Sequence, residues 1–146
     1  MHAGARIPVF RRTRQVTPRD VDLLGHVNNV VWVRFVVELA EAHASALGLG
    51  FHATRERGGL WIVRRHDVLY HANVPLGSEI HETTWVASMR GALSRRHARF
   101  ADAAGKLLVE SETEWAWVDA TTLRPRRIPP AIRERFDLVE GPPPGA

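Results

Sequence analysis

The segment 20–29, Asp-Val-Asp-Leu-Leu-Gly-His-Val-Asn-Asn, places carboxylates, an imidazole and two short amides directly before a long apolar stretch. Carboxylates and imidazoles are common nucleophiles and general bases. Asn is a favoured helix N-cap, so we expect Asn28 or Asn29 to cap a helix. The backbone N–H groups at a helix start favour developing negative charge. Asp22 and His26 would then lie beside an oxyanion site, the arrangement that attack on an acyl carbonyl requires.

Each of these side chains also has a purely structural interpretation. Asp22 is typical of a turn or a cap, and Asp20 is best explained as an acceptor in the turn that begins at Pro18. His26 can pack and hydrogen-bond the loop as well as position a water molecule. Asn28 and Asn29 are caps rather than direct catalysts, although a cap that fixes an oxyanion site affects the rate indirectly.

The apolar stretch that follows is predicted to be one long buried helix over residues 30–47. Its polar residues fall at steps of four, three and four along the chain, which confines them to a narrow stripe of a helix: Arg34, Glu38, Glu41 and Ser45. The rest of its surface is apolar, and such a helix is buried on most sides. Gly48 suits the positive φ that commonly ends a helix.

The remaining chain reads as strands separated by glycine-containing turns. Alternation of apolar and polar residues predicts strands over residues 9–16, 60–72, 79–88, 92–101 and 106–118. Hairpin turns are expected at Gly77-Ser78, Arg90-Gly91 and residues 102–105. Residues 131–136 suggest a short last helix, and the Pro/Gly-rich tail 137–146 is expected to be disordered.

The order of these elements indicates an α+β fold in which a curved antiparallel sheet covers one helix. The run Asp-x-x-Gly-His-Val-Asn-Asn before an apolar helix resembles the hotdog-fold acyl-CoA thioesterases of the 4-hydroxybenzoyl-CoA thioesterase type, over roughly residues 8–136. The resemblance implies a five-stranded antiparallel sheet wrapped around one long buried helix. It also implies a single hotdog domain over residues 1–136.

The resemblance assigns the chemistry to Asp22, as the nucleophile or as the general base on a water molecule. It places the thioester oxygen near the backbone of Asn29, with His26 as a further catalytic candidate. Other residues expected near the substrate are Gly25, Asn28, Trp32 and Tyr70. Plant acyl-ACP thioesterases carry Asp-x-Asn-x-His in this region, whereas this chain has Leu24 at the middle position and no cysteine.

The implied reaction is hydrolysis of an acyl-CoA to the free acid and CoA. An acyl-ACP thioesterase, or a hotdog domain that binds an acyl group or a partner without turnover, remains an alternative; a hotdog hydratase is disfavoured by the Asp–His spacing. Arg95 belongs to an arginine group around one hairpin that would either contact CoA phosphates or protect a solvated strand edge. Family members assemble through their helices and sheets, so a homodimer or homotetramer is expected.

Composition excludes several other classes of function. The chain has no cysteine, which rules out disulfides and a thiol nucleophile, and its eight histidines lack the spacing of a metal site. No cofactor motif is present. The net charge of +4 is modest and no basic-aromatic motif points to nucleic acid. The N-terminus lacks a signal-peptide pattern and charges interrupt the apolar stretch, so we expect no membrane span and a cytoplasmic location.

Overall fold

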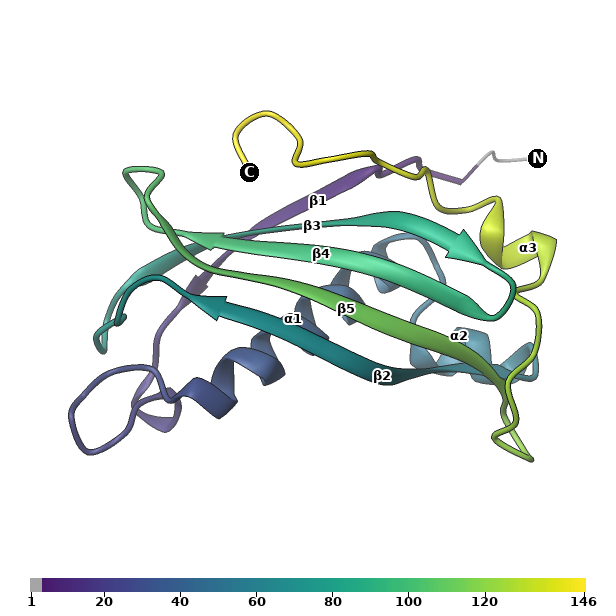
Figure 1. Cartoon of the computed structure of the whole chain (residues 1–146), viewed down its shortest axis with the longest axis horizontal. Coiled ribbons are helices and arrows are strands. Elements are labelled where there is room, and N and C mark those ends of the chain that lie inside the picture. The colour runs from purple at the N-terminus through teal and green to yellow at the C-terminus, as the bar shows by residue number, and fades with distance from the viewer. Residues whose placement is uncertain (1–3) are drawn as a thin grey trace.

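The computed structural model describes residues 4–146 and consists of one curved sheet and one long helix (Figure 1). Its strands are β1 (Val9–Gln15), β2 (Gly59–Tyr70), β3 (Glu79–Arg90), β4 (Leu93–Ala101) and β5 (Leu107–Asp119). The helices are α1 (Asn29–Ala46), α2 (Phe51–Glu56) and α3 (Pro130–Arg133), and a short 3-10 turn, η1, covers Pro18–Asp20.

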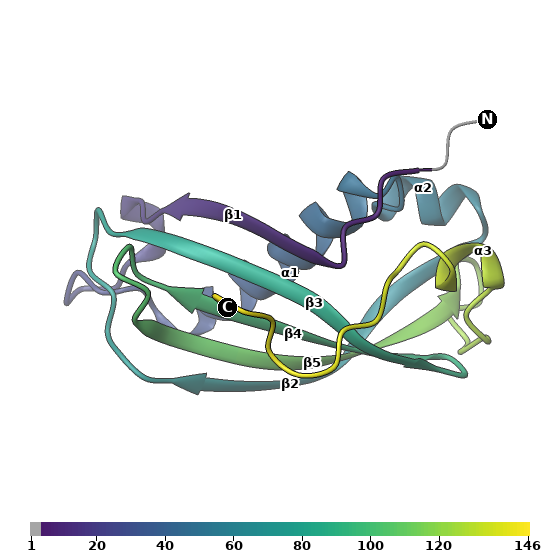
Figure 2. The same ribbon diagram turned by 90° about the horizontal axis from the view of Figure 1, so that it is seen from above.

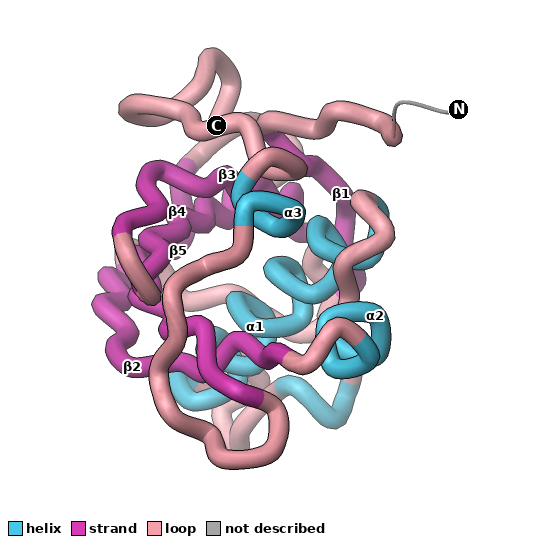
Figure 3. The backbone as a smooth tube through the Cα atoms, turned by 90° about the vertical axis from the view of Figure 1, so that its right-hand side faces the viewer, coloured by secondary structure: helices cyan, strands magenta, loops and turns pink. Residues whose placement is uncertain are grey.

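The five strands form one antiparallel sheet in the order β1-β3-β4-β5-β2. Register shifts interrupt β2 near Val63 and β3 near Val86, and such irregularities increase the bend of a sheet. The bent sheet wraps around α1, which lies in its hollow (Figures 2 and 3). The predicted hotdog fold is therefore confirmed.

The predicted hairpin turn at Gly77-Ser78 is wrong. β2 pairs with β5, and β3 pairs with β1 and β4, so residues 71–78 carry the chain from one edge of the sheet toward the other. Hydrophobic alternation identifies strands but does not specify which strands pair. The other two predicted turns do join neighbouring antiparallel strands, β3 to β4 and β4 to β5.

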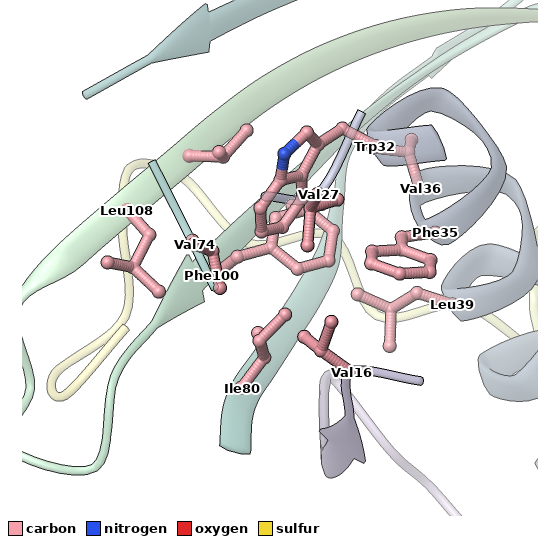
Figure 4. Packing of buried hydrophobic residues seen from close by; sticks show 12 residues of the cluster. Val16, Val27, Trp32, Phe35, Val36, Leu39, Val74, Ile80, Phe100 and Leu108 are labelled. Carbon is pink, nitrogen blue, oxygen red and sulfur yellow. The ribbon is translucent and has the colours of Figure 1, made fainter. Parts of the chain in front are cut away.

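Helix α1 confirms the predicted helix to within one residue at each end. It begins after Asn28, whose side chain accepts a hydrogen bond from the Val30 backbone N–H at 3.2 Å. Its buried residues pack against Ile80 and Phe100 of the sheet (Figure 4), and Val109 belongs to the same cluster. Trp32 lies in this cluster with edge-to-face contacts to Phe35 and Phe100, at centroid distances of 5.4 and 5.2 Å. Each such aromatic residue buries roughly 150–250 Å², so packing of this face of α1 against the sheet stabilises the fold.

Two segments were not assigned a structure from the sequence. Helix α2 was not predicted, because six residues carry too little periodicity to identify a helix. The tail 137–146 has no helix or strand, yet the structure places it across the sheet (Figure 2). The Val139 backbone N–H donates to the Val86 carbonyl at 2.9 Å, and Asp137 pairs with Arg6.

Two further properties concern residues 4–146. No helix in this range is long and apolar enough to cross a lipid bilayer. The same residues contain no group of three or more His, Asp or Glu side chains arranged to hold a metal ion.

Candidate active site at the start of α1

Asp22 begins a tight loop that leads into α1. Its Oδ1 accepts hydrogen bonds from the backbone N–H groups of Leu24 at 2.9 Å and His26 at 3.3 Å. The Asp22 N–H donates to the His26 carbonyl at 2.9 Å, which closes the loop. Gly25 has a φ of +76°, a conformation that disfavours any residue with a side chain. The sequence Asp-x-x-Gly thus specifies the loop itself, and Oδ2 makes no hydrogen bond with the described residues.

A second loop in the chain has the same geometry. Asp102 Oδ1 accepts from the N–H groups of Ala104 and Lys106, both at 2.9 Å, in the β4–β5 hairpin. Gly105 has a φ of +88°, close to that of Gly25. Loop formation therefore accounts for an aspartate at position 22 without any catalysis. What distinguishes Asp22 is its surroundings, because the Asp22 loop leads into α1 and the Asp102 loop joins two strands.

The connection between β2 and β3 holds the Asp22 loop in place. Val27 N–H donates to the Val74 carbonyl at 2.8 Å, and Leu76 N–H donates to the Gly25 carbonyl at 2.9 Å. His26 forms a bridge with Pro75. These contacts were missed from the sequence because residues 71–78 were interpreted as ending in a hairpin turn. These contacts attach the loop to the connection between β2 and β3.

The start of α1 presents a free backbone donor near this loop. The Asn28 side chain caps Val30, and the Asn28 carbonyl accepts from the Val31 N–H at 2.9 Å. The Asn29 N–H has no acceptor among residues 4–146, as expected for a donor available to an anion. Tyr70, at the end of β2, donates its hydroxyl to the Asn29 carbonyl at 2.9 Å, and burial raises the pKa of Tyr70. Tyr70 thus fixes the helix start from the other side.

Asp20 has the structural role that the sequence favoured. Its Oδ2 accepts from the Thr17 N–H and hydroxyl, both at 2.9 Å, and its Oδ1 pairs with Arg34. Burial alone would raise the pKa of Asp20, but hydrogen bonds from Thr17 and Arg34 outweigh burial and hold that pKa below its usual value. Asp20 is buried at 4% exposure, whereas Asp22 is exposed, so only Asp22 is accessible to a substrate.

The structure brings together six of the eight predicted site residues: Asp22, Gly25, His26, Asn28, Asn29 and Tyr70. Trp32 belongs to the same helix start but is 2% exposed within the core, so contact with an acyl group stays a prediction for it. Arg95 lies on the outer face of the sheet, where it pairs with Glu112 at 3.1 Å. Its neighbour Arg96 is buried on the inner face, so β4 places these two arginines on opposite faces of the sheet.

Apolar side chains are exposed around this loop. Leu23, Leu24 and Val30 are 105%, 80% and 71% exposed, and Leu76, which is hydrogen-bonded to Gly25, is 49% exposed. Large contiguous patches of exposed apolar groups commonly mark a surface that contacts a ligand or a partner. The loop therefore combines a carboxylate, a free backbone N–H and an apolar surface.

Residues 8–136 match the family model of the acyl-ACP thioesterase N-terminal domain. The chain belongs to this family. It is 29% identical over 134 residues to a chloroplastic acyl-[acyl-carrier-protein] hydrolase of Cuphea viscosissima, covering 87% of this chain and 32% of that protein. The chain thus spans about a third of the length of this curated relative.

Solved structures with the same fold include thioesterases named for both carrier types. A 1,4-dihydroxy-2-naphthoyl-CoA thioesterase of Synechocystis has a TM-score of 0.80 at 15% identity, covering 88% of this chain and 95% of that one. An acyl-ACP thioesterase of Bacteroides thetaiotaomicron has a TM-score of 0.79 at 21% identity, covering 93% and 58%. The hotdog thioesterase resemblance is confirmed at the level of family and fold, and the matching family model is the acyl-ACP one rather than a 4-hydroxybenzoyl-CoA one.

Proposed function

We propose that the chain is a thioester hydrolase that releases a free acid from an acyl group carried on a phosphopantetheine thiol, with Asp22 as the catalytic carboxylate. The observation that carries this proposal is an exposed Asp22 in the loop that leads into α1, where the Asn29 N–H has no acceptor among residues 4–146. The family match supports the reaction class.

Two chemical routes fit the geometry. In one route, Asp22 Oδ2 attacks the thioester carbonyl, the C–S bond breaks to give a thiolate, and water then hydrolyses the mixed anhydride. In the other, Asp22 takes a proton from a water molecule that attacks the same carbonyl, and the thiolate leaves. In both, the Asn29 N–H donates to the oxygen that becomes negative. His26, in the same loop, is proposed to position the water. Gly25 is proposed to allow the loop conformation, and Asn28 to cap the helix start.

The proposed first substrate class is acyl-ACP, because the matching family and the curated relative both carry this name. Acyl-CoA is the second candidate, since the Synechocystis structure with the same fold bears that name. Both carriers present the same thiol arm, and they differ in the protein or nucleotide beyond it. A third candidate, an acyl-binding or partner-binding domain without turnover, is supported by the exposed apolar residues at the loop.

Mass spectrometry of the free acid released from matched acyl-ACP and acyl-CoA substrates tests the proposal. We expect hydrolysis of at least one carrier form, with the larger kcat/KM for acyl-ACP. A larger kcat/KM for acyl-CoA would reverse the carrier assignment and leave the reaction class intact. Release no faster than the protein-free control with either carrier, from a folded protein, would reject the hydrolase and favour the binding domain.

We further propose that the protein is a homodimer that pairs along β2. This strand forms one edge of the sheet, and within residues 4–146 only one of its sides is hydrogen-bonded, to β5. Long open edges normally acquire a partner or a cover. Light scattering after size exclusion should give twice the chain mass of 16.4 kDa. A tetramer would place a second interface elsewhere, and a monomer at micromolar concentration would contradict the proposal.

A further inference from the structure

A cavity of about 320 Å³ lies between the C-terminal half of α1, α2 and the sheet. It is at the end of the molecule opposite the Asp22 loop, where α2 and α3 meet the sheet (Figures 1 and 3). Glu41, which lines the cavity, is twelve residues beyond Asn29, roughly 18 Å along the helix. The walls are mainly apolar and include Val37, Ala40, Leu49, Phe51, Trp61 and Met89. The volume is that of a small-molecule site.

One side chain in this cavity carries a buried positive charge. Arg96 points from β4 to the inner face of the sheet and is 7% exposed. Its Nη1 donates to His43 Nδ1 at 2.8 Å and to the Thr84 hydroxyl at 3.2 Å. No carboxylate of residues 4–146 lies within ion-pair distance of this guanidinium. By contrast Arg95, its neighbour in the strand, pairs with Glu112.

The partners of Arg96 orient its charge without neutralising it. Burial and the positive charge of Arg96 lower the pKa of His43 to about 4, so the imidazole is neutral at neutral pH. Its Nε2 lies 2.6 Å from the Ile7 carbonyl and donates to it, which leaves Nδ1 to accept from Arg96. Burial lowers the pKa of Arg96 to about 10, which still leaves it protonated at neutral pH. A buried cation without a counter-charge is unfavourable, and an anion from outside would relieve it.

The other polar groups of the cavity lining leave the Arg96 charge without a counter-ion. Trp115 also lines the cavity. Ser94, two residues before Arg96 in the same strand, adds a hydroxyl to the lining. The acidic residue in the lining, Glu41, already accepts from the Phe51 N–H at 2.8 Å at the start of α2. The cavity thus offers the Arg96 guanidinium and the Ser94 hydroxyl within an apolar wall.

We propose that this cavity binds an apolar carboxylic acid, with the carboxylate on Arg96 and the hydrocarbon or aryl group against the walls between α1, α2 and the sheet. A carboxylate accepts two N–H bonds from one guanidinium and supplies the missing charge. A more highly charged ligand such as a diphosphate would leave charges without partners in this apolar site. Free acids are also what thioester hydrolysis releases, but binding here does not depend on Asp22 being catalytic.

Intrinsic fluorescence provides the test, since Trp61 and Trp115 line the cavity. The wild-type protein is titrated with decanoate, with decanol and with decyltrimethylammonium, each below its micelle concentration. We expect decanoate to bind about tenfold or more tightly than decanol, because a buried charge-assisted pair is lost in the alcohol. The cationic amphiphile should bind most weakly. Equal affinities for acid and alcohol would overturn the proposal.

Two variants in the same strand locate the site. Arg96→Met should abolish the preference for decanoate over decanol, whereas Arg95→Met, on the outer face, should keep it. Loss of the preference in Arg95→Met, or its retention in a folded Arg96→Met, would place the acid elsewhere. If Arg96→Met does not fold, the three-ligand comparison on the wild type still decides whether the protein selects a carboxylate. Unchanged decanoate affinity in an Asp22→Asn protein would show that this site is separate from the proposed catalytic site.

Discussion

Replacing Glu82 by Gln is expected to lower the free energy of unfolding by about 3 kcal/mol. Glu82 lies on β3 with a fully buried side chain, and its two oxygens accept from Arg12 Nε at 2.7 Å and Arg14 Nε at 2.8 Å. The amide of Gln would direct an N–H₂ group at one arginine and remove the negative charge between two cations. Arg14 is held against the Phe35 ring at 4.0 Å and is largely buried, so it cannot move freely into water. Urea unfolding at fixed protein concentration measures the change.

The matched control is Glu112→Gln. Glu112 is paired with Arg95 at 3.1 Å, but both side chains are exposed on the outer face. Exposed pairs contribute at most about 1 kcal/mol, so this variant should unfold at nearly the wild-type urea concentration. Similar losses of unfolding free energy in the two variants would show that burial does not determine how much the Glu82 ion pairs stabilise the fold.

Replacing Asp22 by Asn is expected to reduce kcat for thioester hydrolysis by about 10²-fold to 10⁴-fold, because an amide is neither a nucleophile nor a base at neutral pH. The fold should be unaffected. The Asn carbonyl oxygen can accept from the Leu24 and His26 N–H groups as Asp22 Oδ1 does. Steady-state hydrolysis and urea unfolding of the same preparation measure both properties.

Two other aspartates serve as controls for Asp22. Asp102→Asn changes a loop with the same hydrogen bonds and the same glycine conformation, and it should keep wild-type activity and stability. Asp20→Asn should instead lower the free energy of unfolding. The buried Asp20 carboxylate accepts a hydrogen bond from Thr17 and forms an ion pair with Arg34. Activity that falls equally in Asp102→Asn and Asp22→Asn would point to a general effect of such loops.

The main elements of the fold were predictable from local patterns. The stripe formed by Arg34, Glu38, Glu41 and Ser45 identified α1, and Asn28 marked its start, because a cap and a periodic face are properties of neighbouring residues. Strand pairing was less predictable. The path of residues 71–78 depends on contacts between Pro75, Leu76 and a loop fifty residues earlier in the chain, which leave no local periodicity.

The candidate site was predictable in its residue types but less so in its surroundings. Asp22 and Asn29 could be identified as candidates because they lie at the start of a predicted helix. In the structure the Tyr70 hydroxyl donates to the Asn29 carbonyl. The sequence Asp-Ala-Ala-Gly-Lys at 102–106 already repeats the pattern of 22–26, which explains why the loop alone does not prove catalysis. The buried charge of Arg96 was not predictable, because one strand carries Arg95 and Arg96 side by side and only the register places one inside.

The central claim is that the Asp22 carboxylate cleaves thioesters at the start of α1. Single-turnover release of free thiol from a decanoyl thioester, with protein in excess, tests it most directly. The chain has no cysteine, so a thiol reagent sees only the product. The account predicts rapid release by the wild type and by Asp102→Asn, and release near the protein-free rate by Asp22→Asn. Release by Asp22→Asn at the wild-type rate would contradict it.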